Sequence, residues 1–241
     1  MNVTFITGID TDIGKTYTTG LLAKALYEHG CRVITQKLVQ TGCHDIADDI
    51  VAHRKMMGLP LQEVDEDNTT CPYIFSKPAS PHLASALESR AIDPQEITAA
   101  THNLAQQYDW VLLEGAGGLM VPISDDLLTI DYIARQRYPV ILVTSGRLGS
   151  INHTLMSIEV LKHRSLHLHA IIYNHWQSDD DVQDQQIAAS TKSYLQQYLQ
   201  RYYPHTHWID LPNIDDSKFT ESESSSDSAF SQYVKQLMTD C

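Results

Sequence analysis

Short apolar runs alternate along the chain with longer stretches of helical periodicity. The runs at 111–113 and 140–143 are uninterrupted, which is typical of strands that are covered on both faces of a parallel sheet. Runs rich in β-forming residues at 3–7, 32–37 and 169–173 predict further strands. Helices are predicted between them, the first ending at Gly30 and the others at 45–57, 83–87, 94–107, 151–163, 183–202 and 233–238.

The order of these elements predicts the fold class. Strands that alternate with helices favour a doubly wound, mostly parallel α/β sheet flanked by helices. No internal repeat or clear domain boundary interrupts the pattern, so we expect one domain over residues 1–241. Residues 61–80 are acidic and then contain prolines, and we expect them to form a surface excursion. The Ser-, Asp- and Glu-rich stretch at 215–228 is expected to be a mobile loop.

The segment from Gly8 to Thr16 joins the first predicted strand to the first predicted helix. Backbone N–H groups and the helix dipole favour an anion at such a loop. Lys15 can neutralise β- and γ-phosphates, the Thr16 hydroxyl can bind Mg²⁺, and Gly14 lets the backbone approach the phosphates. The usual motif has four residues between its glycines, whereas this chain has five. The context still predicts a nucleoside triphosphate site on a P-loop NTPase-like fold.

Composition and charge narrow the class of protein. The formal net charge is −13 and no dense cluster of Lys and Arg occurs, so we expect no nucleic-acid partner. No apolar run approaches the roughly 18 residues that span a bilayer. The N-terminus has no signal-peptide pattern, so we expect a cytoplasmic protein with no membrane segment. The four cysteines show no CxxC pair or zinc-binding spacing and are expected to be free thiols.

Acidic residues in two places are candidates for holding Mg²⁺ beside a triphosphate. Glu114 ends an apolar strand and precedes Gly-Ala-Gly-Gly, which in a doubly wound fold lies at the carboxyl edge beside the phosphate loop. Asp48 and Asp49 begin a predicted helix, where acids are also common as simple partners of the helix dipole. Taken alone, these two aspartates favour the dipole role over a metal role.

The motifs of residues 2–174 together resemble those of dethiobiotin synthetase. The five-residue gap in the phosphate loop is itself a feature of that family. The matching segments are 7–16 (TGIDTDIGKT), 37–42 (KLVQTG), 80–82 (SPH), 114–118 (EGAGG) and 148–153 (LGSINH).

The resemblance implies an ATP-dependent ring closure. The family closes the ureido ring of dethiobiotin on 7,8-diaminononanoate, using CO₂ and ATP with Mg²⁺. One substrate amine captures CO₂ as a carbamate, and ATP phosphorylates the carbamate. The second amine then attacks the carbamic-phosphoric anhydride and expels phosphate. The family's substrate site lies near a dimer interface, so the resemblance also implies a homodimer.

The resemblance assigns the phosphate chemistry to residues of this chain. Lys37, Lys15 and Thr11 match positions that serve phosphate or carbamate groups, where fixed positive charge is often the largest catalytic contribution. Nucleotide-binding positions implied by the match are Asp12, Ile13, Gly14, Lys15, Thr16, Tyr17, Asp49, Glu114, Gly117, Asn174 and Pro212.

The resemblance also assigns metal and substrate positions. Thr16, Asp49 and Glu114 match the metal-associated positions, which selects Asp49 over Asp48 through the segment that follows it. Positions implied to bind the substrate are Lys37, Thr41, Ser80, Pro81, Gly149, Ser150, Ile151 and Asn152; the last four open a helix whose backbone amides would hold the substrate carboxylate.

Several of these positions have a plainer interpretation. Lys37, read alone, is typical of a solvated residue at a strand end. Asn174 looks like the family's adenine-binding asparagine, but asparagine at a strand end is often only a turn former. His82 alone is more typical of a packing or capping residue than of a base. Leu38 replaces the family's usual proline, which predicts a looser turn, and Tyr194 is one candidate for a tyrosine lent across the dimer.

Two other functions were weighed. A corrin-type amidoligase resembles this N-terminal region but usually carries a glutaminase domain, for which the chain has no room. A partitioning ATPase usually has a second lysine early in its phosphate loop, where this chain has Asp10. Both features argue against these alternatives.

Overall fold

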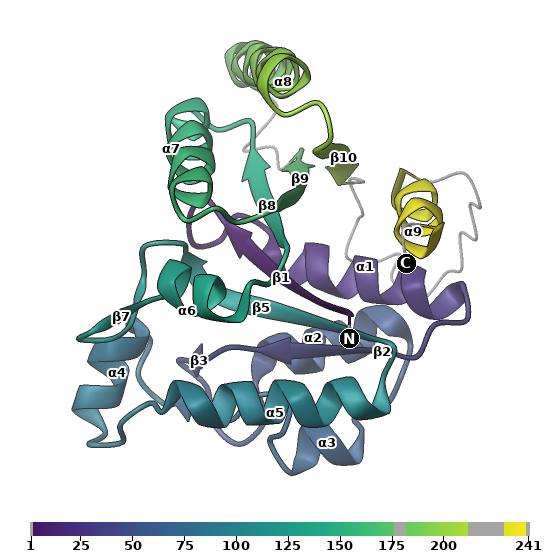
Figure 1. The fold of residues 1–241 in the computed structure, drawn as a ribbon. Helices are drawn as coiled ribbons and strands as arrows, with labels where there is room; N and C mark the ends of the chain where they lie inside the picture. The colour runs from purple at the N-terminus through teal and green to yellow at the C-terminus, as the bar shows by residue number, and fades with distance from the viewer. Residues whose placement is uncertain (1, 176–181, 212–228, 240–241) are drawn as a thin grey trace.

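The computed structural model describes residues 2–175, 182–211 and 229–239 (Figure 1). Within these ranges the main sheet has six strands in the order β10-β9-β8-β1-β5-β2, and every pairing is parallel. The doubly wound α/β class predicted from the sequence is confirmed. The strands are β1 Asn2–Gly8, β2 Val33–Lys37, β5 Trp110–Gly118, β8 Val140–Ser145, β9 Leu168–Asn174 and β10 His207–Leu211.

Helices pack on both faces of this sheet (Figure 1). One face packs against α5, α6, α7 and α8, through buried side chains such as Ile97, Ile130 and Ile158. The opposite face packs against α1, α2 and α9, through side chains such as Leu22 and Val234. The uninterrupted apolar strands are therefore covered on both sides, as the sequence pattern predicted. These helices are α1 Lys15–Glu28, α2 Asp48–Met57, α5 Pro94–Gln107, α6 Thr129–Gln136, α7 Ser150–His163, α8 Val182–Tyr202 and α9 Ala229–Thr239.

The strand order reverses at β1. The chain leaves β1 for β2 and β5 on one side of it, and later adds β8, β9 and β10 on the other side. Ligands of doubly wound folds bind at such a reversal, outside the carboxyl ends of the strands. The register places Glu114 of β5 opposite both Ile6 of β1 and Lys37 of β2, so these two strands bring charged groups together at this edge.

Residues 61–80 lie largely at the surface, as expected, but the segment is anchored in the protein by buried residues. Arg54 of α2 is buried and donates two hydrogen bonds, both 2.8 Å, to the buried carboxylate of Asp65. Its remaining nitrogen donates to Thr35 of β2 at 2.9 Å. Asp65 lies in the short helix α3 Glu63–Glu66, and the segment then pairs β4 Ile74–Phe75 with β3 Gln40–Thr41. The acidic composition of the segment gave no sign that one of its acids, Asp65, is buried and paired with Arg54.

Other element boundaries also differ from prediction. The helix predicted from residue 45 begins at Asp48, because Asp45 has a φ of 62°, outside the helical region. The sequence analysis did not identify α6 or β10. It also did not identify the small hairpin of β6 Pro122–Ser124 and β7 Leu127–Leu128. The helix predicted at 83–87 begins slightly earlier, as α4 Pro81–Leu87.

Leu38 does not loosen the turn after β2. Its side chain is fully buried, and its N–H donates to the carbonyl oxygen of Glu114 at 2.8 Å. A proline at this position has no N–H and could not form this hydrogen bond. The leucine therefore extends the pairing between β2 and β5 by one bond.

Three further expectations concern the chain as a whole. In the described part of the chain, no helix is long and apolar enough to cross a membrane. Cys31, Cys43 and Cys71 are free, as expected. The stretch at 215–228 lies outside the described residues, and the expectation of one domain over 1–241 stays a prediction.

Candidate active site

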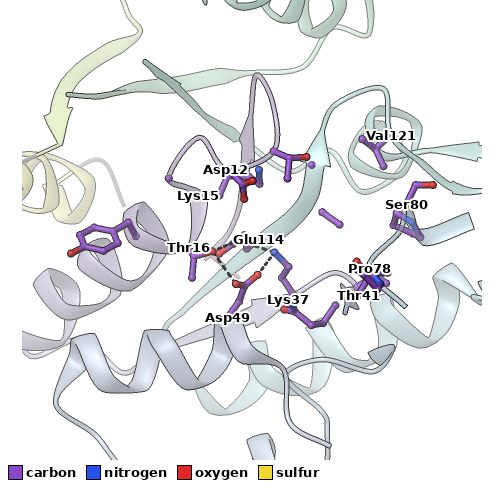
Figure 2. A pocket seen from close by; sticks show the side chains of 18 of the residues that line it. Asp12, Lys15, Thr16, Lys37, Thr41, Asp49, Pro78, Ser80, Glu114 and Val121 are labelled. Carbon is purple, nitrogen blue, oxygen red and sulfur yellow. Dashed lines mark hydrogen bonds and ion pairs between the residues drawn. The ribbon is translucent and has the colours of Figure 1, made fainter. Parts of the chain in front are cut away.

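A pocket of about 960 Å³ lies at the carboxyl ends of β1, β2 and β5. Its volume lies at the upper end of the range for small-molecule sites, which leaves room for a nucleotide and a second ligand. Figure 2 shows the side chains that line it. The lining residues are Thr11, Asp12, Gly14, Lys15, Thr16, Tyr17, Lys37, Val39, Gln40, Thr41, Asp49, Pro78, Ala79, Ser80, Pro81, Glu114, Ala116, Gly117, Val121, Asn174 and Leu211.

The phosphate loop connects β1 to α1 at one side of this pocket. Gly14 has a φ of +96°, and a Cβ there would lie 2.4 Å from the Nδ2 atom of Asn174. Only glycine satisfies both constraints, because side chains rarely adopt this φ and the space is filled. Helix α1 begins at Lys15 without a side-chain cap, so its first N–H groups remain available for an anion.

Lys15 is a buried cation that faces the pocket. Its Nζ atom donates to the carbonyl oxygen of Asp10 at 2.8 Å. Burial, and then the charge of Lys37, lower the pKa of Lys15 to about 8, and nearby carboxylates offset only part of this shift. An anion bound in the loop would raise this pKa again, because negative charge stabilises the ammonium form.

Lys37 lies at the centre of a cluster of charges (Figure 2). Its Nζ atom forms an ion pair with Asp49 and another with Glu114, the latter at 2.8 Å, and donates to the carbonyl oxygen of Gly115 at 3.2 Å. The Thr16 hydroxyl contacts the same two carboxylates, at 3.0 Å from Asp49 and 3.2 Å from Glu114. Strand β2, helix α2, strand β5 and helix α1 thus each place one side chain in this cluster.

The cluster keeps its members charged. Burial disfavours the charged forms of Lys37 and Glu114, but it is outweighed by the sum of their mutual attraction, the nearby charges of Asp49 and His53, and side-chain hydrogen bonds. The pKa of Lys37 is raised by Glu114 and Asp49, and the pKa of Glu114 is lowered by Lys37 and by a hydrogen bond from His53. The surface role that Lys37 would have by its position alone is therefore excluded, since its side chain is only 6% exposed.

His53 is a residue of this cluster that the sequence analysis missed. It is fully buried, and its Nε2 atom lies 3.0 Å from the Oε2 atom of Glu114. Asp49 and His53 are four residues apart in α2, so they lie on one face of the helix. The four-residue spacing of Asp49 and His53 was the sequence signal for this pair. A histidine and an acid on one short helix are common, so the spacing alone did not indicate a site.

Thr16, Asp49 and Glu114 present oxygen atoms that suit Mg²⁺. In nucleotide sites this ion keeps several waters and is held by one or two carboxylates together with phosphates. No group of three or more His, Cys, Asp or Glu within the described ranges is suited to hold a metal by itself. The donor set therefore fits a cation shared with a bound phosphate. Asp49 faces the pocket, whereas Asp48 is exposed and is not among its lining residues.

The structure brings four of the eight predicted substrate positions, Lys37 among them, into the same pocket. Thr41, Ser80 and Pro81 line it. In Figure 2, Lys37 lies between Thr16 and Thr41, so the pocket extends from the phosphate loop to a second region. His82 is adjacent to this region, and its Nδ1 atom lies 3.0 Å from the Ser80 hydroxyl. Lining residues to which no site role was assigned from the sequence are Val39, Gln40, Pro78, Ala79, Ala116 and Val121.

The predicted nucleotide positions are mostly in the pocket as well. Asn174 lines it, and its Nδ2 atom donates to the carbonyl oxygen of Ile13 at 3.0 Å. Ile13 itself is buried and not a lining residue. Pro212 lies outside the described residues, next to the lining residue Leu211.

The predicted anion site at 149–152 is separate from the pocket lining. Gly149 is the N-cap of α7, with a φ of +93° and no capping side chain. The Ser150 hydroxyl is buried and lies 3.2 Å from the Ser145 hydroxyl. Arg147, in the turn before the helix, donates to the carbonyl oxygen of Asp12 at 3.2 Å and so contacts the phosphate loop. Tyr194 is exposed on α8 and does not line the pocket.

Comparison with known proteins identifies the family. A family model described as an AAA domain matches residues 2–216. The "ATP-dependent dethiobiotin synthetase BioD 2" of Pasteurella multocida is 52% identical over 85% of this chain and 94% of its own length. The "ATP-dependent dethiobiotin synthetase BioD" of Chlorobaculum tepidum is 51% identical over 82% of this chain and 81% of its own length. This chain belongs to the dethiobiotin synthetases.

The dethiobiotin synthetase family includes more distant relatives of this chain. The "BioD 1" protein of Escherichia coli K12 is 37% identical over 70% of this chain and 76% of its own length. The resemblance drawn from the phosphate loop, Lys37 and Glu114 is therefore confirmed.

The fold of this dethiobiotin synthetase is shared much more widely. The MinC:MinD cell division protein complex of Aquifex aeolicus aligns with a TM-score of 0.57 at 14% identity, covering 100% of this chain and 97% of that chain. A ParA family ATPase from Chlorobium tepidum aligns with a TM-score of 0.52 at 15% identity, covering 100% and 99%. At such identities the likeness concerns the fold alone.

Proposed function

We propose that this protein closes the ureido ring of dethiobiotin from 7,8-diaminononanoate, CO₂ and ATP. The observation that carries the proposal is one pocket in which two buried lysines, Lys15 and Lys37, face a phosphate loop at one end and a second region at the other. An ATPase that only transferred phosphate to water would not need the second region. Membership of the dethiobiotin synthetases indicates the product, and the pocket has room for both ATP and the diamine.

The two lysines have different tasks in this proposal. Lys15 holds the β- and γ-phosphates of ATP on the loop. Lys37 lies between the loop and the region of Thr41, where it can face both the γ-phosphate and the carbamate (Figure 2). A carbamate and a phosphate are both negative, so fixed positive charge between them lowers the energy of bringing them together. Thr11 and Thr41 would donate hydrogen bonds to the phosphate and carbamate oxygens.

The chemistry proceeds through two bond-forming steps. A carbamate oxygen attacks the γ-phosphorus, and the bond to ADP breaks. The second substrate amine then attacks the carbamate carbon, the bond from this carbon to the phosphorylated oxygen breaks, and phosphate leaves with that oxygen while the amine gives up one proton to the phosphate. Lys37 stays protonated throughout, because the carboxylates of Asp49 and Glu114 raise its pKa.

We propose that ATP is accompanied by Mg²⁺ held by Thr16, Asp49 and Glu114. Bound Mg²⁺ would neutralise charge on the β- and γ-phosphates. Lys37 forms ion pairs with Asp49 and Glu114, whose oxygens suit the cation. This arrangement supports a cation that arrives together with ATP, since phosphates supply the remaining ligands.

The outer parts of the two ligands are assigned by the same proposal. Asn174 binds the adenine base, with Pro212 on the other side, and Ser80 and Pro81 contact the diamine. The amides at 149–152 hold the carboxylate of the substrate. That helix terminus does not line the pocket, so we propose a homodimer in which the substrate tail reaches it near the interface. A cytoplasmic location also stays a prediction.

Phosphate release tests the proposed function. Purified protein with ATP and Mg²⁺ is expected to release phosphate when 7,8-diaminononanoate and bicarbonate are both added, and much less when either is omitted. A matched reaction with 1,8-diaminooctane, whose amines are too far apart to close a ureido ring, is the control. Release that does not depend on the diamine would refute the proposal.

A further inference from the structure

The carboxylate of Glu114 is held from two sides, and the two oxygens have different partners. Oε1 lies 3.2 Å from the Thr16 hydroxyl and 2.8 Å from Nζ of Lys37. Oε2 lies 3.0 Å from Nε2 of His53. Both Glu114 and His53 are fully buried. One oxygen therefore faces the pocket and the other faces the imidazole.

The chemistry of the pair defines the hydrogen bond. A carboxylate oxygen accepts hydrogen bonds, so His53 is the donor in this contact, through Nε2. The Nδ1 atom of His53 is buried and has no hydrogen-bond partner among the described residues. A ring with a proton on Nδ1 would leave a buried N–H without an acceptor, which is costly. The two contacts therefore favour a ring that carries a proton on Nε2.

Helix α2 places two residues, Asp49 and His53, against the cluster. Asp49 and His53 lie one turn apart on the same face of this helix. Asp49 contacts Thr16 and Lys37 directly, whereas His53 reaches only Glu114. Rotation of the Glu114 carboxylate away from its present orientation would break the bond to His53 and leave Oε2 buried without a partner.

We propose that His53 is a positioning residue that fixes the carboxylate of Glu114, so that Oε1 alone is presented to Thr16, Lys37 and the cation. This inference rests on the proposed function, because Mg²⁺ bound with ATP is the group toward which Oε1 is aimed. His53 is not among the lining residues of the pocket, so it acts through Glu114. Groups that orient a metal-binding carboxylate or histidine typically change metal affinity or activity 10- to 100-fold when they are removed.

Two substitutions separate positioning from simple packing. His53→Leu fills the space but removes the donor, whereas His53→Gln keeps an N–H donor at the Nε2 position. His163→Leu, at an exposed histidine of α7, is the matched control. The readout is the Mg²⁺ concentration that gives half-maximal turnover at saturating ATP, diamine and bicarbonate. Binding of a fluorescent ADP in the presence of EDTA is measured alongside.

The expected results are specific to metal positioning. His53→Leu should raise the half-saturating Mg²⁺ concentration about 10-fold or more, while binding of the fluorescent ADP without metal stays at the wild-type level. His53→Gln should recover most of the wild-type Mg²⁺ dependence, and His163→Leu should match the wild type. If His53→Leu has the wild-type Mg²⁺ dependence, or if Gln is as impaired as Leu, the inference is wrong.

A measurement on the unmodified protein covers the case in which His53→Leu does not fold. Histidine side-chain ¹⁵N NMR of the metal-free wild type should show His53 with a proton on Nε2 and none on Nδ1. The opposite tautomer would overturn the inference. Wild-type protein that gives no diamine-dependent turnover would refute the proposed function instead, and the NMR result would still test the Glu114 contact.

Discussion

At the scale of single residues, the pKa values of two lysines in one pocket are shifted in opposite directions. Burial and the charge of Lys37 lower the pKa of Lys15 to about 8, whereas two carboxylates raise the pKa of Lys37. Lys37 is already neutralised by the protein, but Lys15 is not fully compensated and gains most from an incoming anion. The sequence motif identifies both lysines, but only the structure shows this difference.

Lys15→Ala should abolish turnover and leave the fold intact. We expect a loss of at least about 100-fold in phosphate release, because the side chain stabilises phosphate charge. The melting temperature should not fall, since the substitution also removes a desolvated charge. Lys24→Ala, on the same helix and paired with Glu28, is the control and should keep full activity. Retained activity in Lys15→Ala would contradict the assignment of the loop.

Gly14→Ala should weaken nucleotide binding as well as stability. The new Cβ would meet Nδ2 of Asn174 at 2.4 Å and would force a φ of +96° on an alanine. Gly30 is a matched control, because its φ is +85° but nothing lies within 4 Å of a Cβ there. Both variants should lose about 1–2 kcal/mol of unfolding free energy from the backbone strain.

Titration with fluorescent ADP separates the two glycines. Only Gly14→Ala should also lose nucleotide affinity, because its methyl group displaces Asn174 and the loop. Equal affinity in Gly14→Ala and Gly30→Ala would show that the close approach to Asn174 does not matter for binding.

At the scale of elements, the pocket depends on residues 61–80, whose acidic and proline-containing composition does not indicate a role in a site. Pro78, Ala79 and Ser80 line the pocket, and the chain leading to them is anchored by the ion pair of Arg54 and Asp65. Lys37 is tied to the same segment, because its N–H donates to the carbonyl oxygen of Thr70 at 2.8 Å. A buried charge pair between α2 and α3 thus connects the helix that carries Asp49 to the second region of the pocket.

Asp65→Ala should destabilise the protein by about 3–5 kcal/mol, because it leaves the guanidinium of Arg54 buried without its partner. Urea denaturation measures this loss. Glu66→Ala changes an exposed acid in the same short helix and should alter stability by less than about 0.5 kcal/mol. Similar midpoints for the two variants would mean that the buried pair does not anchor the segment.

How well the sequence predicted each strand depended on how continuous its run of apolar residues is. Strands such as 140–143 were identified because every residue is apolar and both faces are covered. The strand β10 was missed because His207 and Asp210 interrupt its apolar residues and it pairs only with β9. The partnership of Arg54 with Asp65, and of His53 with Glu114, could not be predicted, since charge and polarity along the chain do not reveal a buried partner.

At the scale of the whole molecule, the fold explains why distant residues form one site. Lys15 follows β1, Lys37 ends β2 and Glu114 lies in β5. The reversal of strand order at β1 brings these positions together. The sequence motifs therefore predicted which residues meet at the phosphate end. The helix terminus at 149–152 is apart from the pocket lining, and only the proposed dimer connects it to the substrate.

The proposed dimer predicts a molar mass in solution twice that of one chain. Light scattering coupled to size-exclusion chromatography measures it at micromolar concentration. A mass of one chain, in a preparation that turns over diamine at the full rate, would show that the substrate tail is bound without a second copy.

The most direct measurement of the central claim is isotope incorporation into the product. Protein, ATP, Mg²⁺ and 7,8-diaminononanoate are incubated with ¹³C-bicarbonate, and the product is analysed by mass spectrometry together with released phosphate. We predict dethiobiotin that carries one ¹³C in its ureido carbonyl, with one phosphate released for each ring closed. Phosphate release without labelled dethiobiotin, or no reaction in the presence of all substrates, would contradict the account.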